Sequence, residues 1–147
     1  MGADVVDAES QREAGSEQEP AVGERTGLEM RELSNAMVRL YKEQFGRGPT
    51  KARSAYAGPD AVLCTLENSF TPAEQSLVRM GEHQRLRDTR MFFQYATEKE
   101  FRETVEQITG RKVRAFVSGV DVERDVSSEL FYLEPGARSD DAAGPAA

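Results

Sequence analysis

The feature that most constrains how this chain can fold is a helix start in its middle, at Thr71-Pro72-Ala73-Glu74. The Thr71 hydroxyl can accept a hydrogen bond from the free backbone N–H groups of a first helical turn. Proline is favoured at the first helical position, and a glutamate three residues after the cap can bond back to the cap N–H. The motif therefore divides the folded part into strands before Thr71 and a helical region after it.

The segment before this motif predicts one helix and one hairpin. Apolar residues recur every three or four positions from Leu28 to Phe45, which indicates a helix with one apolar face. Gly46 follows at the position where a left-handed backbone ends a helix. Two short strands are predicted next, Lys51–Ala57 and Ala61–Glu67, and the turn Gly58-Pro59-Asp60 joins them into a hairpin.

The segment after the motif predicts a long helical region. No proline interrupts residues 73–109, so we expect one long helix or two helices, with Gly81 as the weak point and Gly110 as the end. A single helix over 72–109 would run about 57 Å at 1.5 Å per residue, which is long for a small domain.

A second hairpin is predicted at the end of the folded part, from the strands Lys112–Asp121 and Ser127–Leu133. Alternation in the first of these strands places Phe116 and Val117 on opposite faces, with Val117 on the face of Val113. The order is then helix, hairpin, one or two helices, hairpin. This order (α-β-β-α-β-β) predicts an α+β fold with a single, mainly antiparallel sheet packed by helices.

Both ends of the chain differ in composition from its middle. Residues 1–27 hold seven acidic side chains, two arginines and few large apolar residues, and residues 136–147 are rich in Ala, Gly and Asp. Such segments cannot bury enough apolar surface to offset chain entropy. We therefore predict two disordered tails around one domain at 28–135. The net charge of −7 belongs mostly to the tails and neither favours nor excludes an anionic ligand on the domain.

Composition also limits the chemistry of the chain. Cys64 is the only cysteine and lies in an apolar run, and His83 is the only histidine. We therefore expect no disulfide framework, metal site, cofactor or catalytic residue. No run approaches the roughly 20 apolar residues of a membrane-spanning helix, and no signal-peptide pattern begins the chain. We expect a cytoplasmic protein that reaches a membrane only through a partner.

A basic cluster is the first candidate binding site. Arg47 and Gly48 lie in a glycine loop, near Lys51 and Arg53, and Arg111 follows the end of the last helix. Because loop N–H groups and guanidinium groups suit anions, Arg47, Gly48 and Arg111 form a candidate anion-binding site. The alternative is a structural role, in which the loop needs glycine for its geometry and the arginines bond to helix C-terminal carbonyls.

A basic and aromatic stretch in the helical region is the second candidate. Arg87 and Arg90 share a helix face at i, i+3 spacing. The aromatic residues after them point in several directions on one helix, so they cannot all face a small core. The alternatives are a solvated face with local ion pairs and burial of the aromatic rings against the hairpins. The predicted partner or dimer interface consists of Arg87, Arg90, Met91, Phe92, Phe93 and Tyr95.

Two further patterns keep other function classes open. Four glutamates between residues 98 and 106 resemble paired carboxylates, but a charged outer helix face beside Lys99 and Arg102 is the favoured explanation, since nothing in the sequence implies a cleft. Arg111, Lys112 and Arg114 enter a strand beside Phe116, as in sheets that stack bases, but without a known RNA-binding motif. A nucleic-acid-binding regulator and an enzyme on a small anionic substrate are therefore the alternatives to a protein-contact role.

Several motifs of this chain occur together in one known family. They are the segments 41–49 (YKEQFGRGP), 61–66 (AVLCTL), 70–74 (FTPAE), 105–113 (VEQITGRKV) and 131–133 (FYL). In combination they resemble the MpsC-like family of small bacterial domains, over Leu28 to Pro135. The resemblance implies an accessory of a membrane-potential-generating, cation- or bicarbonate-linked transport system, and it supplies no catalytic residues.

The resemblance and the residues together give one functional expectation. We expect a non-enzymatic accessory or regulatory protein, acting as a homodimer, that contacts a membrane transport protein through its helical face. An anion at Arg47 and Arg111 would modulate that contact. Nucleic acid is the less favoured partner.

Overall fold

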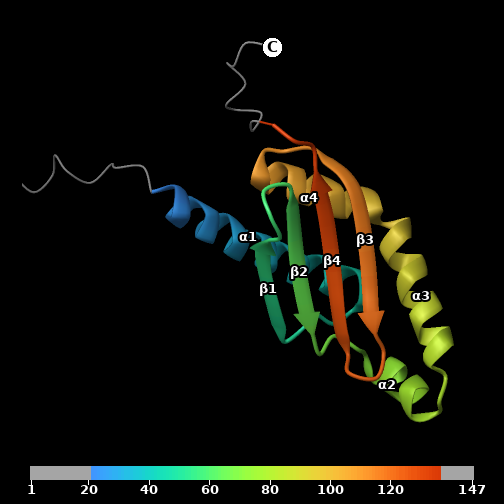
Figure 1. The fold of residues 1–147 in the computed structure, drawn as a ribbon. Helices are drawn as coiled ribbons and strands as arrows, with labels where there is room; N and C mark the ends of the chain where they lie inside the picture. Colours follow the sequence, from blue (N-terminus) through green and yellow to red (C-terminus); the bar gives the residue numbers. More distant parts are fainter. Residues whose placement is uncertain (1–20, 137–147) are drawn as a thin grey trace, which may run out of the picture.

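A four-stranded antiparallel sheet in the order β1-β2-β4-β3 forms the centre of the molecule (Figure 1). The computed structural model describes residues 21–136; the disorder predicted for residues 1–20 and 137–147 lies outside them. The α+β class and the antiparallel sheet predicted from the sequence are confirmed. The strands are β1 (Lys51–Tyr56), β2 (Ala61–Glu67), β3 (Val113–Asp121) and β4 (Val126–Leu133). The helices are α1 (Val22–Phe45), α2 (Pro72–Arg79), α3 (His83–Ala96) and α4 (Glu98–Thr109).

Helix α1 begins at Val22 and not at Leu28, so residues 22–27 of the predicted tail are helical. These turns are held by helical hydrogen bonding and not by burial. The Thr26 hydroxyl donates to the Val22 carbonyl at 3.0 Å, and Glu24 lies in the first turn, where a negative charge is favourable. The apolar periodicity missed this part because it detects only turns that face the core. Gly46 ends α1 with φ 79°, as predicted.

The helical region after Thr71 contains three helices. The predicted helix start is confirmed: Glu74 N donates to Thr71 Oγ1 at 3.2 Å, and Thr71 N donates to Glu74 Oε1 at 3.0 Å. Gly81, with φ 79°, marks the predicted break between α2 and α3. A second break at Thr97 was not predicted, because neither glycine nor proline marks it.

The main core lies between one face of the sheet and the helices α1 and α4. We call this face the inner face. It carries Val62, Cys64 and Leu66 of β2 and Phe131 and Leu133 of β4. In Figure 1, α1 and α4 lie behind the sheet and α3 runs beside β3. Helix α4 fills its share of the core with Phe101, Val105 and Ile108, as its spacing predicted.

The predicted face assignment in β3 is wrong. Phe116 is buried together with Val113, whereas Val117 is 49 % exposed. The cause is an irregularity in the pairing of β3 with β4 between Val113 and Ala115. An extra residue at such a bulge reverses the alternation of the strand after it, which simple counting from Val113 cannot detect.

Candidate functional site

Helix α3 presents its aromatic residues outward and its polar residues inward. Phe92, Phe93 and Tyr95 are 70 %, 42 % and 46 % exposed, whereas Arg90 and Gln94 are buried. The interface set predicted from the sequence is therefore divided by the fold. Arg87 is exposed and Met91 is half-buried, so they lie with the aromatic residues, but Arg90 lies inside.

Arg90 connects α3 to the start of α2. Its Nε donates to Glu74 Oε2 at 2.5 Å and its Nη2 to Glu74 Oε1 at 2.6 Å. Nη2 also donates to the Ser69 carbonyl at 3.1 Å, and the guanidinium group lies 3.7 Å from the centre of the Phe45 ring. Burial acts to raise the pKa of Glu74, but hydrogen bonds from Arg90 and Thr71 hold it below its usual value. The Arg90 charge is thus satisfied within the chain.

Gln94 lies one turn further along α3 and joins a buried polar cluster with Tyr41 of α1 and Glu129 of β4. The Tyr41 hydroxyl donates to Glu129 Oε1 at 2.5 Å. Gln94 Nε2 donates to Tyr41 Oη at 2.8 Å and to Glu129 Oε1 at 2.5 Å. We call these three residues the Glu129 cluster. It links the helices α1 and α3 to the central strand β4 through directional bonds.

The side chain of Glu129 is fully buried. Burial raises the pKa of the Glu129 carboxyl to about 7, against the opposing effects of the Tyr41 hydroxyl and the Arg90 charge. Burial, followed by the nearby Glu129 charge, also raises the pKa of Tyr41 well above its usual value. Within residues 21–136, Glu129 Oε2 and Gln94 Oε1 lack a hydrogen-bond partner. Glu129 is therefore a group whose protonation is coupled to its packing.

The Glu129 cluster was not predicted from the sequence, although one signal was present. In β4 the residues Ser127, Glu129, Phe131 and Leu133 alternate on the inner face, and a glutamate in phase with Phe131 and Leu133 marks a buried carboxyl group. No local pattern could identify Tyr41 and Gln94 as its partners, because they lie 88 and 35 residues away in the sequence.

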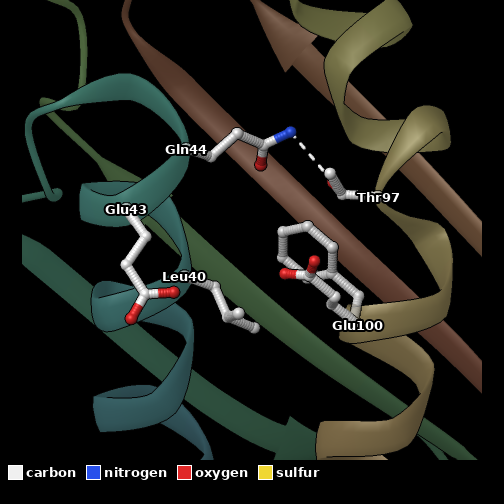
Figure 2. Close-up of a pocket in the computed structure, with 6 residues that line it drawn as sticks. Leu40, Glu43, Gln44, Thr97 and Glu100 are labelled. Carbon is white, nitrogen blue, oxygen red and sulfur yellow. Dashed lines mark hydrogen bonds between the residues drawn. The ribbon is translucent and has the colours of Figure 1, made fainter.

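A pocket of about 330 Å³ lies between the C-terminal part of α1 and the α3–α4 junction, and Figure 2 shows the residues that line it. The Gln44 side chain reaches from α1 towards the α3–α4 junction. Its Nε2 donates to Thr97 Oγ1 at 2.9 Å and to the Phe93 carbonyl at 2.6 Å. Gln44 Oε1 is buried and unpartnered among the described atoms. The pocket is lined by Leu40, Glu43, Gln44, Thr97, Glu100 and Phe101. Its two carboxylates make it unsuited to an anion.

Arg47 and Arg111, the two arginines of the predicted anion site, lie at opposite ends of β2. Arg47 Nη1 donates to the Phe70 carbonyl, and its Nη2 donates to Asn68 Oδ1 at 3.1 Å, just after β2. Arg111 Nη2 lies 2.6 Å from Asp60 Oδ1, just before β2. The two guanidinium groups thus do not meet.

The contacts of the predicted anion site favour its structural alternative. Arg111 also donates to the carbonyls of Pro59 at 2.7 Å and of Glu134 at 2.8 Å, which ties the first hairpin turn to the end of β4. A Cβ atom at Gly48 would lie 3.2 Å from both Val38 Cγ1 and the Val38 carbonyl oxygen, so glycine permits close packing of the loop on α1. The structural alternative predicted that Arg47 and Arg111 bond to carbonyls at helix C-termini. The carbonyls that they bond to lie in loops instead.

The residues weighed for catalysis or nucleic-acid binding have partners within the chain. Cys64 is buried, as predicted, and burial raises the pKa of its thiol to about 12. His83 Nε2 lies 3.9 Å from an exposed Glu123 carboxylate. Lys112 Nζ lies 3.8 Å from Glu106 Oε2, and the Arg114 guanidinium lies 5.3 Å from the centre of the Tyr132 ring.

Two further glutamates of the predicted carboxylate set lie in surface ion pairs, and Glu100 lines the pocket of Figure 2. Glu98 lies 3.9 Å from Arg102, and Glu103 lies 3.7 Å from Lys99. A shallow pocket of about 210 Å³ brings Glu106 close to Arg111, but Glu106 accepts the Val113 N–H at 3.2 Å. The described residues contain no cluster of three His, Cys, Asp or Glu side chains suited to a metal ion.

Comparison with known proteins identifies one family. A family model described as Na+-translocating membrane potential-generating system (MpsC) matches residues 26–135, which include every strand and nearly all of the four helices. The resemblance seen in the motifs is thereby confirmed. No curated protein and no solved structure matches the chain. Among residues 21–136, none of the helices is both long enough and apolar enough to cross a membrane.

Proposed function

The chain belongs to the MpsC family, and from this membership we propose that it is a non-enzymatic accessory or regulatory protein of a membrane ion- or bicarbonate-transport system. It acts by protein–protein contact and not by chemistry at a catalytic centre. In this role it is a cytoplasmic protein that lies at the membrane only while bound to a membrane transport protein.

The observation that carries this proposal is the orientation of α3. A helix that packed by the usual rule would bury Phe92 and Phe93 and expose Arg90 and Gln94. Here the polar side chains are used for internal bonds, and the aromatic rings are left on the surface. Aromatic residues are enriched at protein interfaces, and Phe92 and Phe93 already contact each other edge to face at 5.7 Å between ring centres.

We call the exposed surface formed by the aromatic residues Phe92, Phe93 and Tyr95 together with Arg87 the α3 face. Its aromatic residues extend towards α1, since Phe93 lies 6.1 Å from Phe45 between ring centres. Tyr95 is fixed by its hydroxyl, which accepts the Ser118 N–H of the edge strand β3 at 3.1 Å. A surface held in place in this manner loses little side-chain entropy when a partner binds.

The predicted anion site is not part of this proposal, because Arg47 and Arg111 lie apart and are bonded to oxygen atoms of the chain. Nucleic acid is the less suitable partner because the basic side chains that would bind it already have partners within the chain. Lys112 pairs with Glu106, and Arg114 lies over the Tyr132 ring.

The test is a pull-down of the full chain from native cells after mild cross-linking and nuclease treatment. The variant is Phe92→Lys, and the matched control is Val22→Lys, which changes an equally exposed apolar residue at the far end of α1. We expect an integral membrane transport protein with the wild type and the control, and at least ten-fold less with Phe92→Lys. Equal recovery with Phe92→Lys, or capture that disappears with nuclease, would contradict the proposal.

A further inference from the structure

The face of the sheet opposite the core is uncovered in the part of the chain that the structure describes. Figure 1 shows α1 and α4 behind the sheet, α3 beside it and α2 at its lower end, and none of them in front. We call this surface the open face. A solvated face of an antiparallel sheet is usually polar, so its composition shows whether water is the intended neighbour.

The open face has an apolar row across all four strands. The strand register places Ala55 of β1 opposite Leu63, Leu63 opposite Leu130, and Leu130 opposite Val117 of β3. Directly paired residues of antiparallel strands share one face. Ala55 and Val117 at the ends of the row are exposed, and the two leucines between them are half-buried. A row of four apolar side chains in register indicates a surface that another layer covers.

Charges on the open face differ between its two edges. Further along the strands, a parallel row runs from Lys51 of β1 through Glu67 and Val126 to Asp121 of β3. Lys51 and Asp121, at the two ends of this row, are both exposed. Lys51 lies 3.3 Å from the Glu67 carboxylate beside it, so the β1 end of the row holds an ion pair, whereas the β3 end holds the acidic Asp121.

We propose that the open face is the surface through which two copies of this chain associate, sheet on sheet, about a two-fold axis parallel to the strands. This rotation places β1 of one copy over β3 of the other and β2 over β4. It leaves the position of each row along the strand direction unchanged. It places Ala55 over Val117 of the second copy and Leu63 over Leu130 of the second copy. It also places Lys51 over Asp121 of the second copy, so these two opposite charges face each other.

The charges also select this axis over the other in-plane choice. A two-fold axis perpendicular to the strands would stack β1 on β1 of the second copy and bring two Lys51 and two Arg53 side chains together along one edge. Like charges in such an arrangement oppose association. Packed sheets keep their strand directions within about 30°, so the rows still meet approximately in the favoured arrangement.

The size of the open face fits a small specific interface. With strands about 4.8 Å apart and a rise of about 3.3 Å per residue, the face measures roughly 19 Å by 25 Å, and two such faces bury about 1,000 Å². The proposal does not rest on the proposed function, since it uses the sheet and not the α3 face. It also differs from the dimer interface predicted from the aromatic residues of α3.

The first test is sedimentation velocity on the full chain over a concentration series from micromolar to several hundred micromolar. We expect a monomer–dimer equilibrium for the wild type and at least ten-fold weaker association for Leu130→Glu. Phe92→Glu is the matched control, because it places the same charge on the α3 face, and it should dimerise as the wild type does. A monomeric wild type, or a dimer lost in Phe92→Glu and kept in Leu130→Glu, would overturn the proposal.

The second test examines the axis and does not depend on how a charged variant folds. Ala55→Cys chains and Val117→Cys chains are mixed and oxidised; native Cys64 is buried and does not interfere. We expect a disulfide-linked dimer from the mixture and little from either variant alone, because Ala55 meets Val117 of the second copy and not its own equivalent. Cross-linking of Ala55→Cys with itself, or none in the mixture, would overturn the proposed arrangement.

Discussion

Helices α3 and α4 are neighbours in the chain, yet they are held in opposite ways. Helix α4 buries Phe101 and Val105 in the main core and exposes Glu100 and Glu103. Helix α3 buries Arg90 and Gln94 together with one apolar residue, Leu86, and exposes Phe92 and Phe93. Apolar burial fixes the rotation of α4 about its axis. In α3, directional bonds from Arg90 and Gln94 act together with the packing of Leu86 in a small cluster with Phe70 and Val122.

The difference shows a limit of sequence patterns on helices. The apolar pattern of a helix indicates its buried face only when burial of apolar side chains determines how the helix packs. In α3 the buried polar atoms would be costly without partners, so the partners select the rotation. The aromatic residues are then free to serve as a surface. The comparison gives α4 a structural role. It gives α3 a structural role on its buried side, and the proposed function assigns a binding role to its exposed side.

The largest expected effect in this comparison comes from the core residue of α4. Phe101→Ala removes a fully buried ring that lies 5.7 Å from Phe116 and 6.3 Å from Tyr41 between ring centres. We expect a loss of about 4 kcal/mol in the free energy of unfolding, because the cavity cannot close in a packed core. Urea unfolding measures it. A loss below about 2 kcal/mol would show that α4 is not held by apolar burial.

The buried ion pair of α3 gives the next largest effect. Arg90→Met leaves the Glu74 carboxylate, whose side chain is 15 % exposed, without its counter-ion, and we expect a loss of about 3 kcal/mol in urea unfolding. The double variant Arg90→Met with Glu74→Gln removes the charge and keeps a capping side chain, so it should recover at least half of that loss. If the double variant is no more stable than Arg90→Met, directional bonding of the pair is not what holds α3.

The pH dependence of stability tests the Glu129 cluster. Because the pKa of Glu129 is raised to about 7 in the folded protein, the folded state keeps a proton that the unfolded state loses above about pH 4.5. The favourable contribution is complete at low pH and is lost as the pH rises through 7. Relative to Glu129→Gln, the wild type should lose on the order of 2–3 kcal/mol between pH 4.5 and 8.

Comparing the pH series of the wild type with that of Glu129→Gln isolates the contribution of Glu129. Glu74, whose pKa is lowered and not raised, titrates in both proteins, so its contribution cancels in the difference. The nearby charged or titratable groups, Tyr41 and Arg90, are unchanged by the substitution. Parallel pH profiles for the wild type and Glu129→Gln would mean that the pKa of Glu129 is the same in the folded and the unfolded protein, which would contradict the prediction.

The smallest expected effect belongs to the outer side of α3. Phe92→Ser removes a ring that is mostly in solvent, so we expect a change of less than about 0.5 kcal/mol in the free energy of unfolding. The contrast with Phe101→Ala, the same kind of residue one helix further along, is then about eight-fold. A loss above about 1.5 kcal/mol for Phe92→Ser would mean that the ring has a structural role.

Local chemistry explains which parts of the fold could be predicted. The cap at Thr71, the glycine ends of α1 and α4 and the apolar face of α4 depend on residues close in the sequence, and all were predicted. The reversed phase of β3 depends on a bulge, and the break at Thr97 lacks a glycine or proline, so neither had a sequence signal.

The candidate site was harder to predict for the same physical reason. The rotation of α3 depends on Glu74, Tyr41 and Glu129, whose contacts with it span 16 to 53 residues along the chain. The aromatic residues were correctly singled out as too many for one core. Arg90 was placed with them because spacing on a helix cannot show which polar residue has a buried partner.

The most direct test of this account is site-specific photo-cross-linking in native cells, with a benzophenone side chain in place of Phe92 on α3 or of Glu103 on the exposed side of α4. The account predicts a cross-linked product with an integral membrane protein from position 92 and none from position 103. Products of equal yield from both positions, or no membrane protein from position 92, would contradict the claim that the α3 face is the surface that binds the partner.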